Sequence, residues 1–267
     1  MPILRQCDDS LIDQLSPLGA SCFPLLPYSN RLRDGLFVIG DQRYQHSLNC
    51  PPEKHSSHGD AWMRQWRIGG ISGSHIELLL EPEDKQPIKY LASQIVRLEN
   101  STVSIHIQVT NKDDVRAPFG LGIHPYFRRS ADAQLVCHLE RQWETDAEFM
   151  PLRSIANPMS ARMANGILVR DLPESGAFYS ASTNAQIAWP SNGLRLDIES
   201  DPPMQHAIVW CPAGQDFFCY EPVSHMVDGF NMERAGVRNS GVKHLDPNQS
   251  LEATWTFSVS VEGSPTP

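Results

Sequence analysis

The sequence predicts a mostly β protein, built as a large antiparallel sandwich or barrel. The clearest strand covers residues 102–110, where valine or isoleucine alternates with polar side chains, a period that buries one face of a sheet. Other strand-like runs follow at spacings of very roughly 10 to 20 residues, separated by Pro, Asn and Gly. Helical patterns are scarce. These three observations favour the large antiparallel β folds.

The first predicted strand is the apolar run 36–39, which lies between Asp34-Gly35 and Gly40-Asp41. Because Asp-Gly beside apolar residues is a hairpin signal, we expect a hairpin turn at Asp34-Gly35. The remaining predicted strands are 76–80, 93–98, 102–110, 133–139, 185–189, 194–198, 207–210 and 254–259.

Two segments could form short helical turns, residues 10–15 and residues 60–66. The second is equally well explained as a loop that runs into a strand. All-β domains of this length are commonly single units, so we expect one domain over residues 1–267.

The charge pattern excludes some partners. The net charge is -9 and the Lys and Arg residues are dispersed, so no basic stripe is available for nucleic acid. The N-terminus lacks a signal-peptide pattern, and no apolar run reaches the roughly 18 residues of a membrane span. We therefore expect a cytoplasmic protein that binds neither nucleic acid nor membrane; the sequence leaves the oligomeric state open.

The six cysteines show no Cys-x-x-Cys pair, and a chain of this size needs no disulfide staples, so reduced thiols are expected. Cys219 lies among Phe217, Phe218 and Tyr220. This context is typical of a strand residue that packs in the core rather than of a nucleophile.

Two ionisable residues stand in unusual contexts. His124 lies between a glycine-rich approach and Pro125-Tyr-Phe, and the proline restricts the backbone of the histidine before it. Glu221 comes directly after the apolar run 217–220 and before Pro222, where partial desolvation would raise its pKa and make it a better base. Alone, His124 could equally be structural, and for Glu221 a solvated glutamate at a strand end is the favoured interpretation.

Other chemistries find less support. His58, His124 and Glu221 are the right kinds of ligand for zinc or iron, but no histidine pair has the i, i+4 spacing of a helical metal motif. We therefore do not expect a metal site. A serine hydrolase is weaker still, because no Gly-x-Ser-x-Gly elbow occurs.

Several residues suit a sugar, whose C–H faces pack on aromatic rings while its hydroxyls need many hydrogen-bond partners. The candidate substrate contacts are Asn30, Arg31, His58, Trp66 and Tyr126.

Four blocks of the sequence, in order, resemble the aldose 1-epimerase (galactose mutarotase) family over roughly residues 20–260. They are Pro27-Tyr-Ser-Asn-Arg31, then Asn49 with His58-Gly59 and Trp66, then Gly122-Ile-His124-Pro-Tyr-Phe127, and finally Phe218-Cys-Tyr-Glu221-Pro222 with Asp228-Gly-Phe230-Asn231.

The resemblance implies a β-supersandwich with an open cleft, no metal and no cofactor. It also implies interconversion of the α and β anomers of a hexose, with His124 as general acid, Glu221 as general base, and Arg31 and His58 as sugar contacts. An acid and a base that act together predict a bell-shaped pH profile.

One position departs from the family pattern. Where the family commonly has a sugar-binding aspartate, this chain has Ser175, and Glu174 or Asp171 could supply the carboxylate instead.

Two alternatives therefore stay open. A sugar-binding protein without turnover is one of them. The other is a hexose 6-phosphate epimerase, which would need cations at the cleft rim, for which Arg33, Arg43, Arg64, Arg67, Arg128 and Arg129 are candidates.

Overall fold

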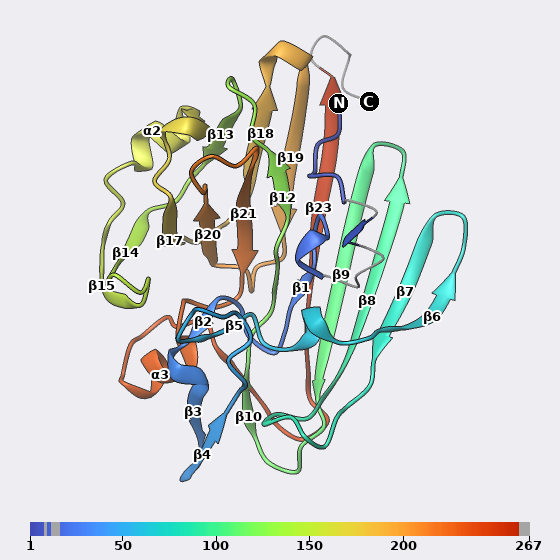
Figure 1. Ribbon diagram of the computed structural model, residues 1–267, viewed down its shortest axis with the longest axis vertical. Helices are drawn as coiled ribbons and strands as arrows, with labels where there is room; N and C mark the ends of the chain where they lie inside the picture. Colours follow the sequence, from blue (N-terminus) through green and yellow to red (C-terminus); the bar gives the residue numbers. More distant parts are fainter. Residues whose placement is uncertain (8–9, 12–16, 262–267) are drawn as a thin grey trace.

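The computed structural model describes residues 1–7, 10–11 and 17–261, and two large antiparallel sheets form most of it (Figure 1). The eight-stranded sheet has the order β1-β11-β21-β20-β17-β14-β15, with β12 also paired to β21. Its strands are β1 (Pro24–Leu25), β11 (Gly122–Ile123), β12 (Tyr126–Arg128), β14 (Arg141–Thr145), β15 (Pro151–Ala156), β17 (Ser175–Tyr179), β20 (His206–Trp210) and β21 (Phe217–Val223).

The nine-stranded sheet has the order β16-β13-β18-β19-β23-β9-β8-β7-β6. Its strands are β6 (Arg67–Ile71), β7 (His75–Leu80), β8 (Tyr90–Glu99), β9 (Thr102–Asn111), β13 (Gln134–Cys137), β16 (Ile167–Leu168), β18 (Ala185–Trp189), β19 (Leu194–Ser200) and β23 (Ser250–Val261). These sheets confirm the predicted mostly β, supersandwich fold class.

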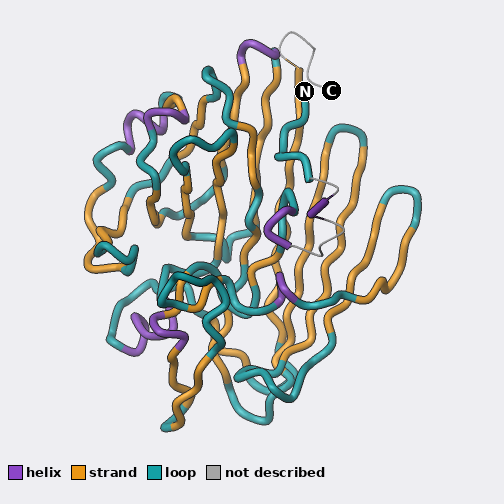
Figure 2. The backbone as a smooth tube through the Cα atoms, in the orientation of Figure 1, coloured by secondary structure: helices purple, strands orange, loops and turns teal. Residues whose placement is uncertain are grey.

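Small elements complete the fold, and helices are short and few in Figure 2. Three two-stranded ribbons are β2 (Arg31–Leu32) with β5 (Ser56–Ser57), β3 (Leu36–Ile39) with β4 (Gln42–Gln45), and β10 (Ala117–Phe119) with β22 (Lys243–Leu245). The helices are α2 (Ser160–Ala164) and α3 (Gly229–Arg234), with 3-10 turns η1 (Pro17–Gly19), η2 (Arg33–Gly35), η3 (Ala61–Met63), η4 (Val169–Asp171) and η5 (Pro190–Asn192).

Strand β21 is buried on both faces, because a hydrophobic cluster packs against each of them. Phe218 and Tyr220 point into the core between the two sheets, together with residues of β13, β18 and β19. Phe217 and Cys219 point to the opposite side. Since side chains alternate along a strand, Glu221 shares the face of Cys219 and points away from the intersheet core.

Two local predictions need correction or restriction. The hairpin turn is at Gly40-Asp41, between β3 and β4, and not at Asp34-Gly35. Asp34 and Gly35 instead end η2, where Gly35 has φ +69 and a side chain would meet the His46 carbonyl at 2.3 Å. The predicted helical turn at 10–15 falls mostly outside the described residues. Residues 60–66 are the 3-10 turn η3 and a loop that runs into β6.

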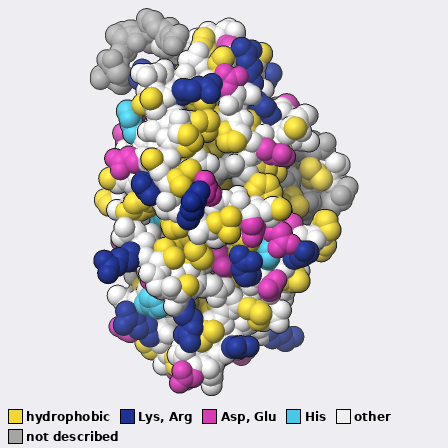
Figure 3. Space-filling view, turned by 90° about the vertical axis from the view of Figure 1, so that its left-hand side faces the viewer, with side chains coloured by type: hydrophobic (Ala, Val, Ile, Leu, Met, Phe, Trp, Pro, Cys, Tyr) yellow, Lys and Arg dark blue, Asp and Glu magenta, His cyan; other side chains and the backbone are white. Residues whose placement is uncertain are grey.

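The surface carries both charges. On the face in Figure 3, Lys and Arg side chains are interspersed with Asp and Glu. Within the described ranges, no helix approaches the length and apolar character of a membrane span.

Candidate active site

A polar cleft of about 330 Å³ opens on the face of the eight-stranded sheet that points away from the intersheet core. Six of the seven residues predicted for the site line it, namely Asn30, Arg31, His58, His124, Tyr126 and Glu221. A larger hollow of about 430 Å³ lies at the N-terminal segment, but it is lined mainly by apolar side chains and contains neither His124 nor Glu221. The polar cleft is therefore the candidate site.

Strand register brings His124 and Glu221 together. Gly122 pairs with Val223, and Tyr126 pairs with Cys219. The same register carried between these two pairs sets His124 opposite Glu221, although 97 residues of chain separate them. The main-chain N–H of His124 is bound by the Phe23 carbonyl at 3.0 Å, so the histidine backbone is held from both sides.

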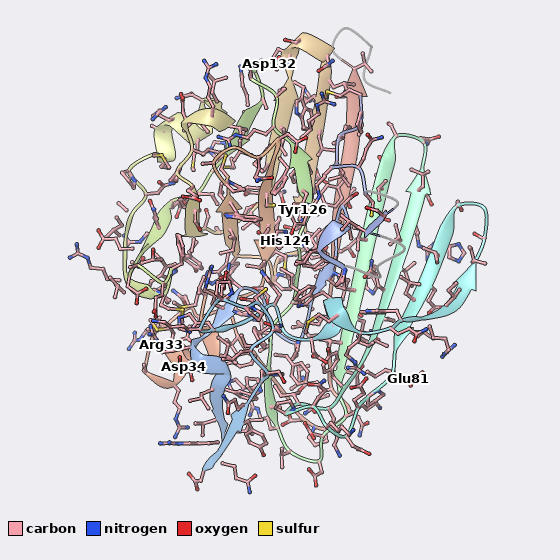
Figure 4. The ribbon with its side chains drawn as sticks, viewed as in Figure 1. Arg33, Asp34, Glu81, His124, Tyr126 and Asp132 are labelled. Carbon is pink, nitrogen blue, oxygen red and sulfur yellow. The ribbon has the colours of Figure 1, made fainter. Side chains whose placement is uncertain are left out.

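The two side chains approach within contact distance. Nε2 of His124 lies 3.4 Å from Oε1 of Glu221, and the side chains are only 7% and 2% exposed. The His124 ring stacks on Tyr126, with ring centroids 4.6 Å apart, and Figure 4 shows this pair near the middle of the molecule. The geometry fixes an imidazole and a carboxyl group side by side in a nearly dry site.

Burial shifts both groups toward their neutral forms. It raises the pKa of Glu221 well above the ordinary value, with a smaller opposing effect from Arg31. It lowers the pKa of His124 well below the ordinary value, and His58 adds to this effect. Desolvation penalises a charge of either sign, so the carboxyl and the imidazole shift in opposite directions. Perturbed pairs of this kind are typical of catalytic sites.

His58 is a second buried histidine beside His124, with ring centroids 5.2 Å apart. Its Nδ1 accepts a hydrogen bond from the Asn30 main-chain N–H at 3.1 Å, and burial, followed by Arg31, lowers its pKa to about 3. A neutral ring that accepts at Nδ1 carries its proton on Nε2. His58 can therefore donate a hydrogen bond from Nε2 to a ligand.

Arg31 and Asn30 supply polar groups at the rim of the cleft. The Arg31 guanidinium binds Oε1 of Glu53 at 3.0 Å and lies 5.1 Å from the centre of the Phe149 ring. Asn30 has φ 56, and its Oδ1 accepts the Arg31 N–H at 2.8 Å. With the amide oxygen engaged, the Asn30 NH₂ group is the part available to a ligand.

Buried residues of the C-terminal third hold the rim segment in place. Nε2 of His225 accepts the Ser29 N–H at 3.0 Å, and Oδ1 of Asp228 accepts the Arg33 N–H at 3.0 Å. Gly120 permits this packing, because a Cβ there would lie 1.8 Å from the His225 ring. These contacts explain why the motif around Asp228 belongs with the site although it does not line the cleft.

Trp66 lies outside the cleft. Its indole N–H binds the Ala61 carbonyl at 2.9 Å, and its ring packs against the core. Trp62, four residues earlier, lines the cleft instead and stacks on Phe23 at 5.5 Å. Trp62 lies within η3 and Trp66 follows it by three residues, so the direction of each ring depends on that turn.

Ser175 and Glu174 both line the cleft, whereas Asp171 does not. Ser175 pairs with Trp210 of β20, which puts it on the cleft face near Glu221. Asp171 forms an ion pair with Arg162 at 3.3 Å. Of the two carboxylates considered from the sequence, Glu174 is therefore the one within reach of a ligand.

Metal ligation was considered for His58, His124 and Glu221. In the described part of the chain, the group whose ligand atoms come together is His124, Cys219 and Glu221, all within 4.8 Å of one another. The thiol was missed from the sequence because it was assigned to the core, and it is indeed fully buried.

The sequence also matches the family model of aldose 1-epimerase over residues 2–258. The chain belongs to the aldose 1-epimerase family. The uncharacterised protein YphB of Escherichia coli K12 is 31% identical over 233 residues, which cover 81% of this chain and 77% of YphB.

Solved structures agree with this membership. A candidate aldose 1-epimerase from Escherichia coli K12 superposes with a TM-score of 0.87 and 25% identity, covering 98% of this chain and 89% of that one. A galactose mutarotase-like protein from Clostridium acetobutylicum has a TM-score of 0.85 at 19% identity, over 97% and 86% of the two chains. The superposition on the Clostridium acetobutylicum protein shows that the two chains share a fold.

Proposed function

We propose that this member of the aldose 1-epimerase family interconverts the α and β anomers of an unphosphorylated hexose or a related aldose. His124 is the general acid and Glu221 is the general base. The observation that carries the proposal is the 3.4 Å separation of His124 Nε2 and Glu221 Oε1 in the lining of a sugar-sized cleft.

The spacing suits the reaction. The ring oxygen and the O1 hydroxyl of an aldose are bonded to the same carbon, so the groups that serve them must be neighbours. Glu221 takes the O1 proton while His124 protonates the ring oxygen, and the C1–ring-oxygen bond breaks to give the aldehyde. Rotation about C1–C2 and closure in the reverse sense return both protons and give the other anomer. The chemistry needs no cofactor.

The cleft lining supports an aldose without a phosphate. Of the described residues around it, Arg31 is the single Lys or Arg, and Glu53 already neutralises its charge. None of the six arginines considered for phosphate binding lines the cleft; Arg33, for example, lies well away from His124 in Figure 4. Glu174, Trp62 and Trp210 instead offer a hydroxyl acceptor and aromatic faces.

The test is polarimetry on fresh α-D-glucose, α-D-galactose and glucose 6-phosphate. We expect acceleration for a neutral sugar and little for the phosphate. His124→Ala and Glu221→Gln should each lower kcat/KM by about 10² to 10⁴, the usual contribution of general acid–base catalysis.

Circular dichroism must show that both variants keep the fold. Binding of an aldose without acceleration of any member of a wider panel would contradict the proposal and favour a non-catalytic sugar-binding protein. Preference for glucose 6-phosphate would contradict the neutral-sugar assignment alone.

A further inference from the structure

We propose that His124, Cys219 and Glu221 form a binding site for a divalent zinc ion, and that zinc bound there inhibits the enzyme by competing with the sugar. The inhibition rests on the proposed function, whereas the binding does not. The group is buried, two of its members, His124 and Glu221, line the cleft, and it contains a thiol to which the mechanism gives no role.

The pairing of the strands brings the three side chains close together on one side of the sheet. Cys219 and Glu221 are two residues apart on β21, so both point to the cleft side of the sheet. His124 precedes Tyr126, the residue paired with Cys219. The ligand atoms of all three lie within 4.8 Å of one another.

The distances are close to those of a tetrahedral site. Zinc bonds of about 2.0 to 2.2 Å to nitrogen and oxygen put two such ligands roughly 3.3 Å apart, and His124 Nε2 lies 3.4 Å from Glu221 Oε1. The sulfur needs a shift of about 1 Å at most to complete the set, given a zinc–sulfur bond of about 2.3 Å.

The donor set suits zinc rather than calcium or magnesium. Imidazole and thiolate are preferred by zinc, while the two hard cations take oxygen ligands. Oε2 of Glu221 is buried with no hydrogen-bond partner among the described residues, so the carboxylate keeps an oxygen free for an ion. The fourth position faces the cleft, where water or a sugar hydroxyl can enter.

Zinc and turnover exclude each other at this site. The ion would take the Nε2 lone pair and the carboxylate oxygen that the reaction uses, and Cys219 would lose its thiol proton to the solvent as the zinc–sulfur bond forms. Inhibition should therefore be competitive with the sugar and reversed by a chelator.

Binding is tested with Co²⁺ as a spectroscopic substitute for zinc, on the full chain. We expect a 1:1 complex with the near-ultraviolet charge-transfer band of a cobalt–thiolate bond, displaced by Zn²⁺. Cys219→Ser should abolish the band and weaken zinc binding at least about tenfold, by calorimetry. The matched control is Cys211→Ser, because Cys211 is also buried but binds the Val169 carbonyl away from the cleft.

The inhibition is tested in a separate experiment. For each variant, we measure the zinc concentration that halves the epimerase rate observed for that variant without zinc. Glu221→Gln supplies a second binding test if Cys219→Ser fails to fold, since it too should lose tight binding. A cobalt complex without the thiolate band, or one equally strong in Cys219→Ser, overturns the site. A cobalt–thiolate complex in a protein without epimerase activity leaves the site standing and refutes only the proposed function.

Discussion

At the residue scale, we expect the titrations of His124 and Glu221 to be coupled, because Nε2 and Oε1 are 3.4 Å apart. The ion pair and the neutral pair contain the same single proton, and burial of both groups opposes the charged form of each. A bound sugar, with hydroxyls that can solvate the charges, shifts this balance. The proposed reaction therefore requires the one-proton state, in which one group can donate while the other accepts.

The one-proton state predicts a bell-shaped pH profile of kcat/KM. A second proton, added at low pH, removes the base; loss of the shared proton at high pH removes the acid. Because the pKa of His124 is lowered and that of Glu221 is raised, the two limbs should be far apart, with the acid limb below the ordinary histidine value of about 6.5. Values of kcat/KM measured from about pH 4 to 10 test the bell-shaped profile, with circular dichroism at each pH to check the fold. A profile with a single limb would contradict the prediction.

At the element scale, the N-terminal segment reaches the site through Tyr126. The Arg5 guanidinium lies 3.7 Å from the centre of the Tyr126 ring and donates to the carbonyls of Leu18 and Ala20. The other face of Tyr126 is open to the stack with His124. We therefore propose that Arg5 is a positioning residue that acts on His124, the proposed general acid, through the Tyr126 ring.

Arg5→Ala should lower kcat more than it changes KM, and should destabilise the fold by about 1 to 2 kcal/mol through the lost cation–π and hydrogen-bond contacts. Removal of a nearby positive charge makes the protonated imidazole easier to form, so the acid limb should move to higher pH. Steady-state kinetics across pH measure both effects. Arg67→Ala is the control, since Arg67 is exposed and paired with Glu81; an unshifted acid limb in Arg5→Ala would refute the role.

Strand positions are the elements that the sequence predicts well. The alternation at 102–110 corresponds to β9, and the predicted strands at 36–39 and 185–189 coincide with β3 and β18, because period-2 burial is a local property. The hairpin turn was misplaced because Asp-Gly and Gly-Asp both flank β3, and only the pairing with β4 distinguishes them.

Site membership was predictable where residue type and strand end coincide, as for His124 and Glu221. Which of Trp62 and Trp66 lines the cleft could not be predicted, because it depends on the direction of each ring around η3. The partnership of Cys219 with His124 was not predictable either, since it depends on pairing between distant strands.

At the scale of the whole molecule, several histidines are buried in neutral form. Burial is the main cause that lowers the pKa of His46 and His225 to about 4 and that of His58 and His206 to about 3. In the unfolded chain each would titrate near 6.5. Protons therefore bind the unfolded state more tightly, and the contribution to stability is complete above about pH 6.5 and is lost as the pH falls toward the folded values.

We expect the free energy of unfolding to fall between about pH 6.5 and 4, by about 1.4 kcal/mol per pH unit for each such histidine. Urea titrations at several pH values measure the slope. His46→Phe should make the slope shallower, since a ring there keeps the stack on Phe37, whereas the exposed His138→Gln should not change it. Equal slopes in all three proteins would contradict the assignment.

The register between β21 and the strands on either side of His124 has an evolutionary consequence. The distance between the proposed acid and base is set by main-chain hydrogen bonds, while most of the cleft rim comes from loops around residues 48–66, 146–150 and 172–174. Insertions and substitutions in these loops can change which aldose fits without disturbing the reacting pair. One catalytic frame can thus diversify in substrate while its chemistry stays constant.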